Sequence, residues 1–384
     1  MLSISGAPAA ATGYPALRVE PREKVVYESN MLGCRDEKGG VVPNDHPDMP
    51  ARAFRDYSGE VRMLANSRQN FQLTGPTLDK VARRSCDRSL TSRNNPEPQA
   101  FDHFQWLMSA YTEDGRKVFG LTHHEYHGRL YFPECKDAHG QDGSWRMRCW
   151  YTSVNFVISN DGGRTFDPPG GRQQPIAVLP YRFASDMNRA GPHSPTNIVK
   201  HPADKHYYVM LQVSPYRDQP RGTCLMRATD LEKADWRAWS GRAFDVDFPN
   251  PYASSITDVR RGICAPVVPW LATSLTYNTH AKGFLLIGYG DAGAVYAWSR
   301  DMLRWSDTAA LLDAVTLPVA IRRRAPEATA YYSALDPSSP GRNYDQTGGR
   351  FFLYYTRYSH PVERGDRGWV FEKRQLVRRA VILQ

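Results

Sequence analysis

The chain has 384 residues, of which 41% are hydrophobic and 23% are charged, the proportions of a globular protein. It contains no apolar run of membrane-spanning length, so we expect no membrane partner. The net charge of +9 comes mostly from arginines scattered among acidic residues, with one dense run at 322–324. This scatter does not favour nucleic-acid binding, although some arginines are suited to bind an anionic or hydroxyl-rich ligand.

In chain order, the sequence predicts an irregular lead-in over residues 1–24 and then a short strand at 25–27 that closes a ring of sheets. Groups of short strands follow, separated by Gly-, Asp- and Pro-rich turns. The expected first strands of five such groups are residues 48–54, 101–111, 193–199, 264–268 and 330–335. One short helix is expected at 307–315.

Three similar turns give the repeat its length. Each has a small residue, a polar residue, an aspartate, a short spacer and an aromatic residue. The three aspartates are Asp161, Asp230 and Asp301, which lie 69 and 71 residues apart. A repeat of this length fits a four-stranded propeller blade with long loops. We therefore predict an all-β fold over residues 1–384, a single five-bladed β-propeller domain of four-stranded antiparallel blades.

The first of these turns, residues 159–166, carries the most detailed expectation. Asp161 is placed to accept hydrogen bonds from the amides of its own turn, and two glycines supply positive φ angles. Phe166 is expected to fold back as a hydrophobic plug.

The six cysteines include no C-x-x-C pair, which argues against a zinc ribbon. Cys135 and Cys149 flank a polar stretch and are spaced to form a disulfide, while free thiols are the alternative. A disulfide would indicate an oxidising compartment. Residues 1–17 lack the basic start of a secretion signal. We expect a secreted or periplasmic protein, with a cytoplasmic location as the alternative.

A propeller has a central channel, and antiparallel pairing brings the start of each first strand and the end of each second strand to the same end of it, its mouth. Several carboxylates lie at such strand ends. Asp48 and Asp102 open two first strands, and Glu125 ends a second strand. We predict these three as the catalytic residues, because paired carboxylates supply the acid and the base of glycoside hydrolysis. Further candidates for substrate binding are Arg52, His123, His124, Asp186, His193, Glu327 and Tyr332.

The densest group of functional residue types is the stretch 123–127, His-His-Glu-Tyr-His. On a strand, His123, Glu125 and His127 share one face and His124 lies on the other. We prefer sugar binding by the histidines, with Glu125 as acid, to a metal site, and we expect no cofactor. Trp106, Tyr126, Trp145 and Tyr332 are core residues by default, and any of them near the mouth could stack on a sugar.

The plan resembles the five-bladed propeller glycosidases, the arabinanases and xylosidases of family 43 and the related invertases and levansucrases. The likeness rests on the D-x-P opening at Asp48 and the turn from Ser299 to Trp305. It implies Asp48 as the general base and a glutamate on a later blade as the acid, for which Glu125 and Glu327 compete.

Residues 159–166 also resemble the Asp-box of sialidases, S-x-D-x-G-x-T-[FW]. Sialidases have six blades and require an arginine triad and a tyrosine nucleophile, which this length does not easily accommodate. The sequence thus favours a hydrolase of oligo- or polysaccharides. The alternatives are a non-catalytic glycan- or protein-binding propeller, a sialidase-like exoglycosidase, and a glycoside phosphorylase.

Overall fold

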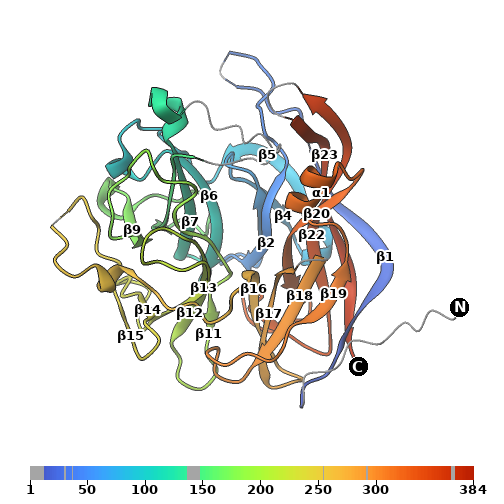
Figure 1. Cartoon of the computed structure of the whole chain (residues 1–384). Coiled ribbons are helices and arrows are strands. Elements are labelled where there is room, and N and C mark those ends of the chain that lie inside the picture. The colour runs from blue at the N-terminus through green and yellow to red at the C-terminus, as the bar shows by residue number, and fades with distance from the viewer. Residues whose placement is uncertain are drawn as a thin grey trace, which may run out of the picture.

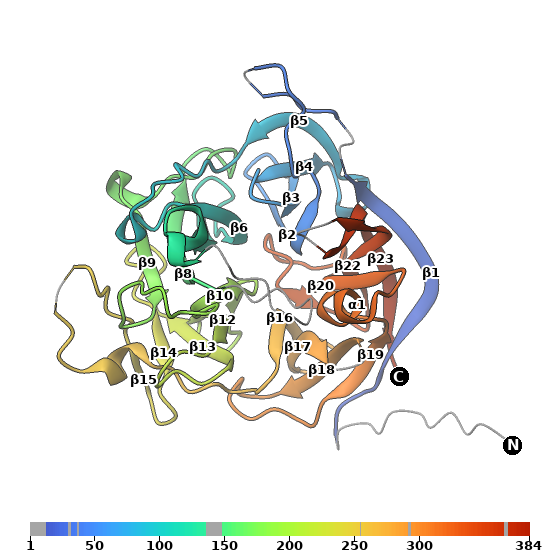
Figure 2. The same cartoon turned by 45° about the horizontal axis from the view of Figure 1, so that its top comes forward.

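Five antiparallel sheets form a ring around a central channel, as Figures 1 and 2 show. The computed structural model describes residues 13–29, 32–36, 38–135, 148–253, 255–290, 293–364 and 368–384. The chain is an all-β protein and a five-bladed β-propeller, which confirms the predicted fold class. The first strands of neighbouring blades contact one another and line the channel.

Each blade is built on four antiparallel strands, to which blades 3 and 4 add short strands, and blade 5 takes its fourth strand from the start of the chain. Blade 1 consists of β2 (Pro47–Arg55), β3 (Val61–Asn66), β4 (Phe71–Gly75) and β5 (Ala82–Arg88). Blade 2 consists of β6 (Phe104–Tyr111), β7 (Val118–His127), β8 (Trp150–Ser159) and β9 (Gln174–Val178). Blade 3 consists of β10 (Gly191–Pro195), β12 (Tyr207–Ser214), β13 (Gly222–Ala228), β14 (Arg237–Trp239) and β15 (Phe244–Val246), with β11 (Val199–Lys200) paired to β12.

Blade 4 consists of β16 (Leu271–Asn278), β17 (Gly283–Gly290), β18 (Gly293–Ser299) and β19 (Ala309–Asp313), with β21 (Gln346–Thr347) parallel to β16. Blade 5 consists of β20 (Ala328–Leu335), β22 (Arg350–Arg364), β23 (Gly368–Leu383) and β1 (Leu17–Glu28). Short 3-10 helices lie in loops at Leu78–Lys80, Pro98–Ala100, Gly128–Leu130, Pro133–Cys135, Pro169–Gly171 and Val259–Gly262.

The ring closes where the first and last strands of the chain pair. β1 runs antiparallel to β23, from Leu17 opposite Leu383 to Glu28 opposite Gln375. The predicted closing strand at 25–27 is therefore real, but it is longer than expected. Residues 17–24, predicted as irregular lead-in, belong to β1 because they pair with the end of β23.

Two local predictions are wrong. The first strand of blade 4 is β16, whereas residues 264–268 form only an isolated bridge at Val268. Residues 307–315 contain β19 in place of a helix, since pairing with β18 overrides the helical propensity of Ala and Leu. The one α-helix among the described residues, α1 (Leu317–Arg323), starts just afterwards with a proline in its first turn.

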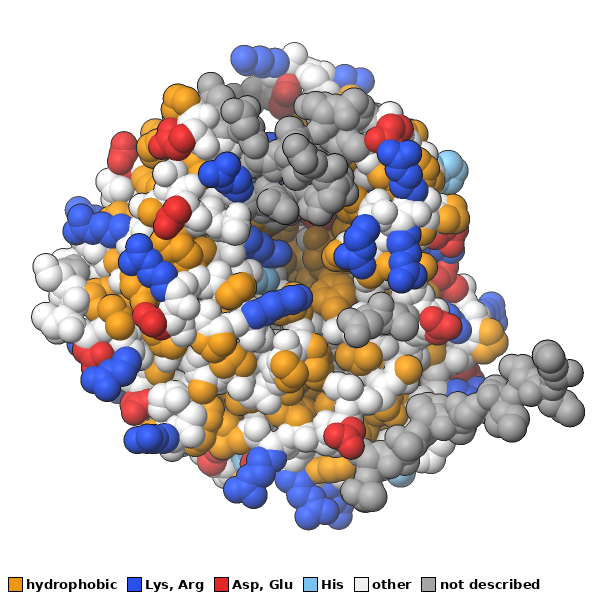
Figure 3. All heavy atoms as spheres, viewed as in Figure 1, with side chains coloured by type: hydrophobic (Ala, Val, Ile, Leu, Met, Phe, Trp, Pro, Cys, Tyr) orange, Lys and Arg blue, Asp and Glu red, His pale blue; other side chains and the backbone are white. Residues whose placement is uncertain are grey.

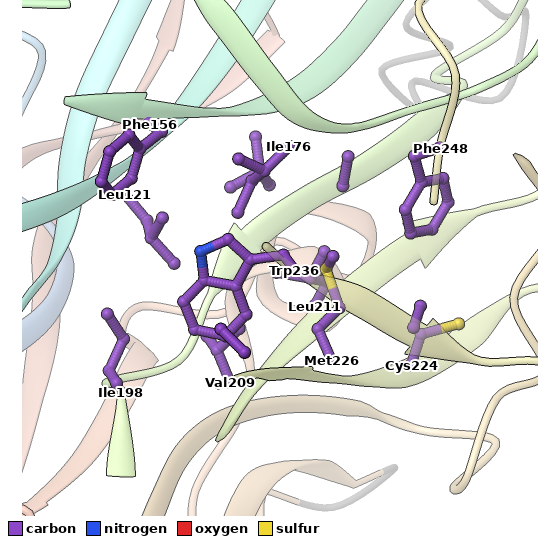
Figure 4. Packing of buried hydrophobic residues seen from close by; sticks show 14 of the residues in the cluster. Leu121, Phe156, Ile176, Ile198, Val209, Leu211, Cys224, Met226, Trp236 and Phe248 are labelled. Carbon is purple, nitrogen blue, oxygen red and sulfur yellow. The ribbon is translucent and has the colours of Figure 1, made fainter. Parts of the chain in front are cut away.

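Hydrophobic clusters between blades hold the ring together. Figure 4 shows the cluster between blades 2 and 3, which is built around the buried Trp236. Leu121 and Phe156 pack from blade 2, and Val209 and Leu211 pack from blade 3. Because neighbouring blades share such a cluster, a change at one interface alters the position of both blades.

The three aspartate turns follow the third strands of blades 2, 3 and 4 and thus share the face opposite the strand starts. Asp161 accepts hydrogen bonds from the amides of Arg164 and Thr165, both at 3.0 Å, and Phe166 is buried as expected. In the second turn Asp235 accepts the amides of Thr229 and Asp230, so Asp230 is not the main acceptor there.

All six cysteines form disulfides, which pair Cys34 with Cys86, Cys135 with Cys149, and Cys224 with Cys264. The expected pair of Cys135 and Cys149 is thus present. None of the described helices has the length and the apolar character needed to cross a bilayer.

Candidate active site

The end of the channel at which the first strand of each blade begins is called the mouth here. At this end β2, β6, β10 and β20 start, and β7 and β17 finish, because adjacent strands are antiparallel. Side chains from different blades therefore meet around one opening. Figure 3 shows the surface hollowed near the centre of the ring, with basic side chains along the hollow.

Asp48, Tyr331 and Arg374 form the Asp48 corner of the mouth. Arg374 donates from Nη1 to Asp48 Oδ1 at 2.5 Å, and the Tyr331 hydroxyl donates to the same oxygen at 3.3 Å. The carboxylate is 20% exposed and the guanidinium 26% exposed, so the ion pair is open to ligands. Burial alone would lower the pKa of Arg374, but the charge of Asp48 outweighs burial and raises it.

The cation that holds Asp48 is therefore Arg374, whereas Arg52, predicted to bind substrate, has other partners. Arg52 is 3% exposed and turns into the channel. Its Nη2 donates to the backbone carbonyls of Thr273 at 2.6 Å and Pro195 at 3.4 Å. Burial lowers the pKa of Arg52 to about 9. Arg52 joins the first strands of three blades and does not face the mouth.

Tyr331 reaches Asp48 because β20 is irregular at this point. The pairing of β20 with β22 shifts between Ala330 and Ser333, and Tyr331 has a φ of +60°. Its amide donates to the Tyr289 hydroxyl at 2.8 Å, which fixes the distortion. A positive φ at a bulky residue is strained, and such strain often occurs at functional sites.

His123, Glu125 and His127 form the Glu125 corner. His123 Nε2 lies 2.7 Å from Glu125 Oε1, and His127 Nε2 lies 2.9 Å from Glu125 Oε2. The three side chains share one face of β7 as predicted, and each carboxylate oxygen accepts one N–H. Burial alone would raise the pKa of Glu125, but the hydrogen bonds and charges of the two histidines outweigh it and hold that pKa well below its ordinary value.

One feature of this corner bears on the prediction of Glu125 as the acid. The two histidines favour the ionised carboxylate, so Glu125 by itself does not hold the proton that an acid gives. His123 is neutral, because burial lowers its pKa and its Nδ1 accepts the Ser194 amide at 2.9 Å. The remaining ring nitrogen of His123 thus carries the proton that it donates to Glu125. Ser194, with a φ of +46°, is the strained residue that aims this amide.

Arg189 lies beside the Glu125 corner, in the loop before β10. Its Nη2 donates to His193 Nδ1 at 3.0 Å, and its guanidinium stands over the Trp150 ring at 4.7 Å. His193 is 1% exposed, and its Nε2 lies 3.0 Å from the Ser214 hydroxyl. Burial lowers the pKa of His193 well below its ordinary value, so His193 is neutral and holds Arg189.

Arg68 lies between the two corners, in the turn after β3. Its guanidinium stacks on Phe104 at 4.0 Å, and burial lowers its pKa while the charges of Glu125 and Asp48 raise it. Both carboxylates therefore act on one cation. Phe104 and Trp106 are half-buried on the first strand of blade 2, and Trp106 packs edge-on against His123. Trp106 is the aromatic group best placed to contact a sugar.

Two residues predicted to bind substrate are core residues. His124 is fully buried on the opposite face of β7, where its Nδ1 lies 3.0 Å from the Ser153 hydroxyl. Tyr332 is fully buried and bonds to Thr329 Oγ1 at 2.7 Å. Neither can touch a ligand at the mouth, and those two predictions are wrong. Trp145 lies outside the described residues.

Three predicted carboxylates are not joined to either corner by any interaction among the described residues. Asp102 accepts the amide of Asn95 at 3.2 Å, and burial raises its pKa. Asp186 accepts the Tyr216 hydroxyl at 3.0 Å, and Glu327 is exposed before β20. Within the described ranges, no cluster of three or more His, Cys, Asp or Glu residues is arranged to hold a metal ion.

The sequence prediction missed Arg68, Arg189, Tyr331 and Arg374. Arg374 lies 326 residues from Asp48 in the chain and meets it only through ring closure. The sequence predicts Tyr332 in place of its neighbour Tyr331, because regular alternation of side chains along a strand does not allow for the bulge in β20. Arg189 lies in the loop before blade 3. The sequence feature that could have indicated it as a site residue is its position four residues before His193.

Neither a protein-family profile nor a curated protein matched the chain. Solved structures resemble it in chain path. A provisionally assigned glycosidase from Bacteroides thetaiotaomicron is 11% identical, with a TM-score of 0.49, over 94% of this chain and 96% of the other. A GH43_1 enzyme from Xanthomonas citri complexed with xylotriose is 13% identical, with a TM-score of 0.42, over 85% and 91%.

An N-acetylgalactosamine deacetylase from F. plautii, in complex with blood group B trisaccharide, is 12% identical, with a TM-score of 0.45, over 96% of this chain and 95% of the other. At these values the likeness concerns the path of the chain, and the activity has to be argued from the side chains at the mouth.

Proposed function

We propose that the protein is a glycoside hydrolase that cleaves an oligo- or polysaccharide at the mouth, with Asp48 and Glu125 as its two carboxylates. The observation that carries this proposal is that Asp48, at the start of β2, and Glu125, near the end of β7, come from different blades to the same end of the channel. Glycoside hydrolysis requires two carboxyl groups on either side of the scissile bond. The half-buried ring of Trp106 offers an aromatic surface for the sugar, whereas the Phe104 ring is covered by the Arg68 guanidinium.

In this proposal Asp48 is the general base. It is held by Arg374 at 2.5 Å and is 20% exposed, so a water molecule can reach its free oxygen. The water oxygen bonds to the anomeric carbon while its proton passes to Asp48. The ion pair with Arg374 fixes the position of the carboxylate beside the attacking water.

Glu125 acts with its two histidines as one proton-carrying unit. Because Glu125 starts ionised, the unit first takes up one proton from solvent, which lies between the carboxylate and its two imidazole partners, and gives that proton to the leaving oxygen. The glycosidic C–O bond breaks as the leaving oxygen takes this proton. Solvent then carries a proton from Asp48 back to the Glu125 unit, so that the cycle adds one water across one bond.

The site of action we propose is an oxidising compartment, outside the cell or in a periplasm. Three disulfides and the absence of a free cysteine support this proposal, because cytosolic thiols are normally kept reduced.

The test is turnover on a panel of oligo- and polysaccharides, measured for the wild type, Asp48→Asn and Glu125→Gln. Each variant keeps the side-chain shape, and turnover should fall by roughly 10²–10⁴-fold with folding unchanged by circular dichroism. Glu113→Gln is the matched control, since Glu113 is an exposed carboxylate bonded to Lys200 at the opposite end of β6. Full activity of either mouth variant would refute the assignment, and wild-type binding without turnover would indicate a glycan-binding module.

A second candidate is an exoglycosidase in which Tyr331 is the nucleophile. The contact of its hydroxyl with Asp48 at 3.3 Å favours this candidate, because a carboxylate can take the phenol proton as the oxygen attacks. Tyr331→Phe separates the two mechanisms. A loss as large as that of Asp48→Asn supports the nucleophile, and a loss below about tenfold supports Asp48 acting on water.

A further inference from the structure

Positive charge exceeds negative charge at the mouth. Three guanidinium groups, from Arg68, Arg189 and Arg374, act on two carboxylates, Asp48 and Glu125. The rings of His123 and His193 add no positive charge, because burial lowers the pKa of each ring and both are neutral. A net positive charge remains in a partly buried site, where it is costly without a counter-charge.

Both carboxylates are already satisfied by other groups. Asp48 is paired with Arg374, and both oxygens of Glu125 accept N–H groups from histidines. Among the described residues, Arg68 and Arg189 take part in no ion pair within 4 Å. Arg68 is held by stacking on Phe104, and Arg189 by His193 and by the face of Trp150.

Arg189 is held in place, but most of its donors are not used. The neutral ring of His193 accepts one N–H, and Ser214 fixes that ring from its other side. The Arg189 Nε is buried without a hydrogen-bond partner among the described residues. The charge of Glu125 raises the pKa of Arg189 against the effect of burial, and His193, which holds Arg189, packs edge-on against His123 of the Glu125 corner.

The exposed Arg221 adds a further positive charge that acts on both Arg189 and His193. Such a group of positive charges is unfavourable by itself. A guanidinium presents a planar pair of N–H donors that matches a carboxylate, sulfate or phosphate in two-point contact. A neutral hydroxyl would accept one of these hydrogen bonds but would leave the charge unbalanced.

We propose that Arg189 and Arg68 form an oxyanion subsite beside the carboxylate pair, which binds an anionic group of the reacting ligand. The proposal rests on the hydrolase function above and names its substrate class, a glycan that carries a carboxylate or a sulfate near the cleaved bond. The same chemistry would also accept free phosphate as the attacking group in place of water. Arg189 supplies the fixed donors, and Arg68 adds a second positive charge near Glu125.

The test is binding measured by calorimetry with monosaccharides that have no glycosidic bond to cleave. The probes are glucuronate, galacturonate, glucose 6-sulfate, neutral glucose and inorganic phosphate. At least one anionic probe should bind, and its binding should weaken as salt is added. Arg189→Gln should weaken that binding by about 10- to 100-fold and Arg189→Lys by less, because lysine keeps the charge but loses the planar fork.

Arg304→Gln is the matched control, since Arg304 is 93% exposed in the Asp301 turn on the opposite face. Equal binding of glucose and the anionic sugars, or an unchanged affinity in Arg189→Gln, would overturn the subsite. Binding of phosphate together with phosphate-dependent cleavage supports the subsite with free phosphate as its source. Binding of an anionic sugar, together with cleavage that does not depend on phosphate, supports an anionic substituent of the glycan as the group that the subsite binds.

The two proposals fail separately. If Asp48 is required for the cleavage of neutral glycans and no anion binds, the hydrolase stands and the subsite is wrong. If anions bind through Arg189 and Asp48→Asn keeps full activity, the subsite stands and the catalytic assignment is wrong.

Discussion

The two carboxylate corners of the mouth use different means to keep one negative charge in place. Asp48 is held by Arg374, a cation that does not titrate in the physiological range, in an ion pair that is about one-quarter exposed. Glu125 is held by His123 and His127, whose side chains are 3% and 14% exposed. The first corner thus depends on an ion pair that solvent reaches, and the second on hydrogen bonds from two largely buried rings.

This difference suits the proposed division of work. A base has to be reached by the attacking water, and a proton donor needs neighbouring groups that can share an added proton. The chain places the first beside arginine and the second between histidines, on different blades. The predictions below test whether the corners differ in stability as this comparison requires, and how a histidine beside Glu125 responds to pH.

The largest effect is expected in the Glu125 corner. His123→Leu removes one of the two N–H donors from a largely buried carboxylate, and we expect a loss of about 2 kcal/mol of unfolding free energy. Denaturant titration measures this loss. The double variant His123→Leu/Glu125→Leu also removes the carboxylate that has lost its hydrogen-bond donor, so part of the unfolding free energy should return. A double variant that is less stable than the sum of the single changes would contradict the account of this corner.

A smaller effect is expected in the Asp48 corner. Arg374→Leu breaks an ion pair whose partners are 26% and 20% exposed, so solvent screens the charge left on Asp48. We expect a loss of about 1 kcal/mol in the same titration, together with reduced turnover. Lys373→Gln is the control on the neighbouring residue and should change stability by less than about 0.5 kcal/mol. If Arg374→Leu costs more than His123→Leu, the comparison of the two corners is wrong.

The smallest effect concerns pH. Burial lowers the pKa of His103, whose ring contacts the Glu125 backbone carbonyl at 3.1 Å, from 6.5 to about 4. As the pH falls, His103 therefore takes up a proton at a higher pH in the unfolded chain than in the folded chain. The stability that neutral His103 contributes is complete above pH 6.5 and is lost as the pH falls from 6.5 towards 4.

Between pH 7 and pH 6 the expected loss from this one group is about 0.7 kcal/mol. His103→Asn should lose less stability than the wild type over that interval, as measured by thermal unfolding at each pH. The remaining slope in the variant comes from other neutral histidines, such as His46, whose pKa burial lowers to about 4. Equal slopes in the two proteins would show that His103 is not buried in its neutral form.

The number of blades could be predicted from the sequence because the turns after the third strands keep a regular spacing. The common face of His123, Glu125 and His127 could be predicted because strand side chains alternate. The separation of His124 from them follows from the same rule. These successes depend on local geometry, which a single sequence expresses directly.

The failures have a different physical origin. The partner of Asp48 could not be found locally, since Arg374 arrives through ring closure while the nearer Arg52 turns into the channel. The start of blade 4 was missed because β16 carries Thr273, Ser274 and Thr276, hydroxyl residues that are buried in this strand. The β20 bulge exchanged the expected positions of Tyr331 and Tyr332.

The pairing of β1 with β23 has a consequence for how the protein is made. Blades 1 to 4 are each complete when their own residues have left the ribosome, but blade 5 joins residues synthesised early to residues synthesised late. β1 must therefore remain an unpaired edge until β23 appears, and such edges promote aggregation. The contact of Arg374 with Asp48 spans the same gap, so the Asp48 corner of the proposed active site forms in the step that finishes folding.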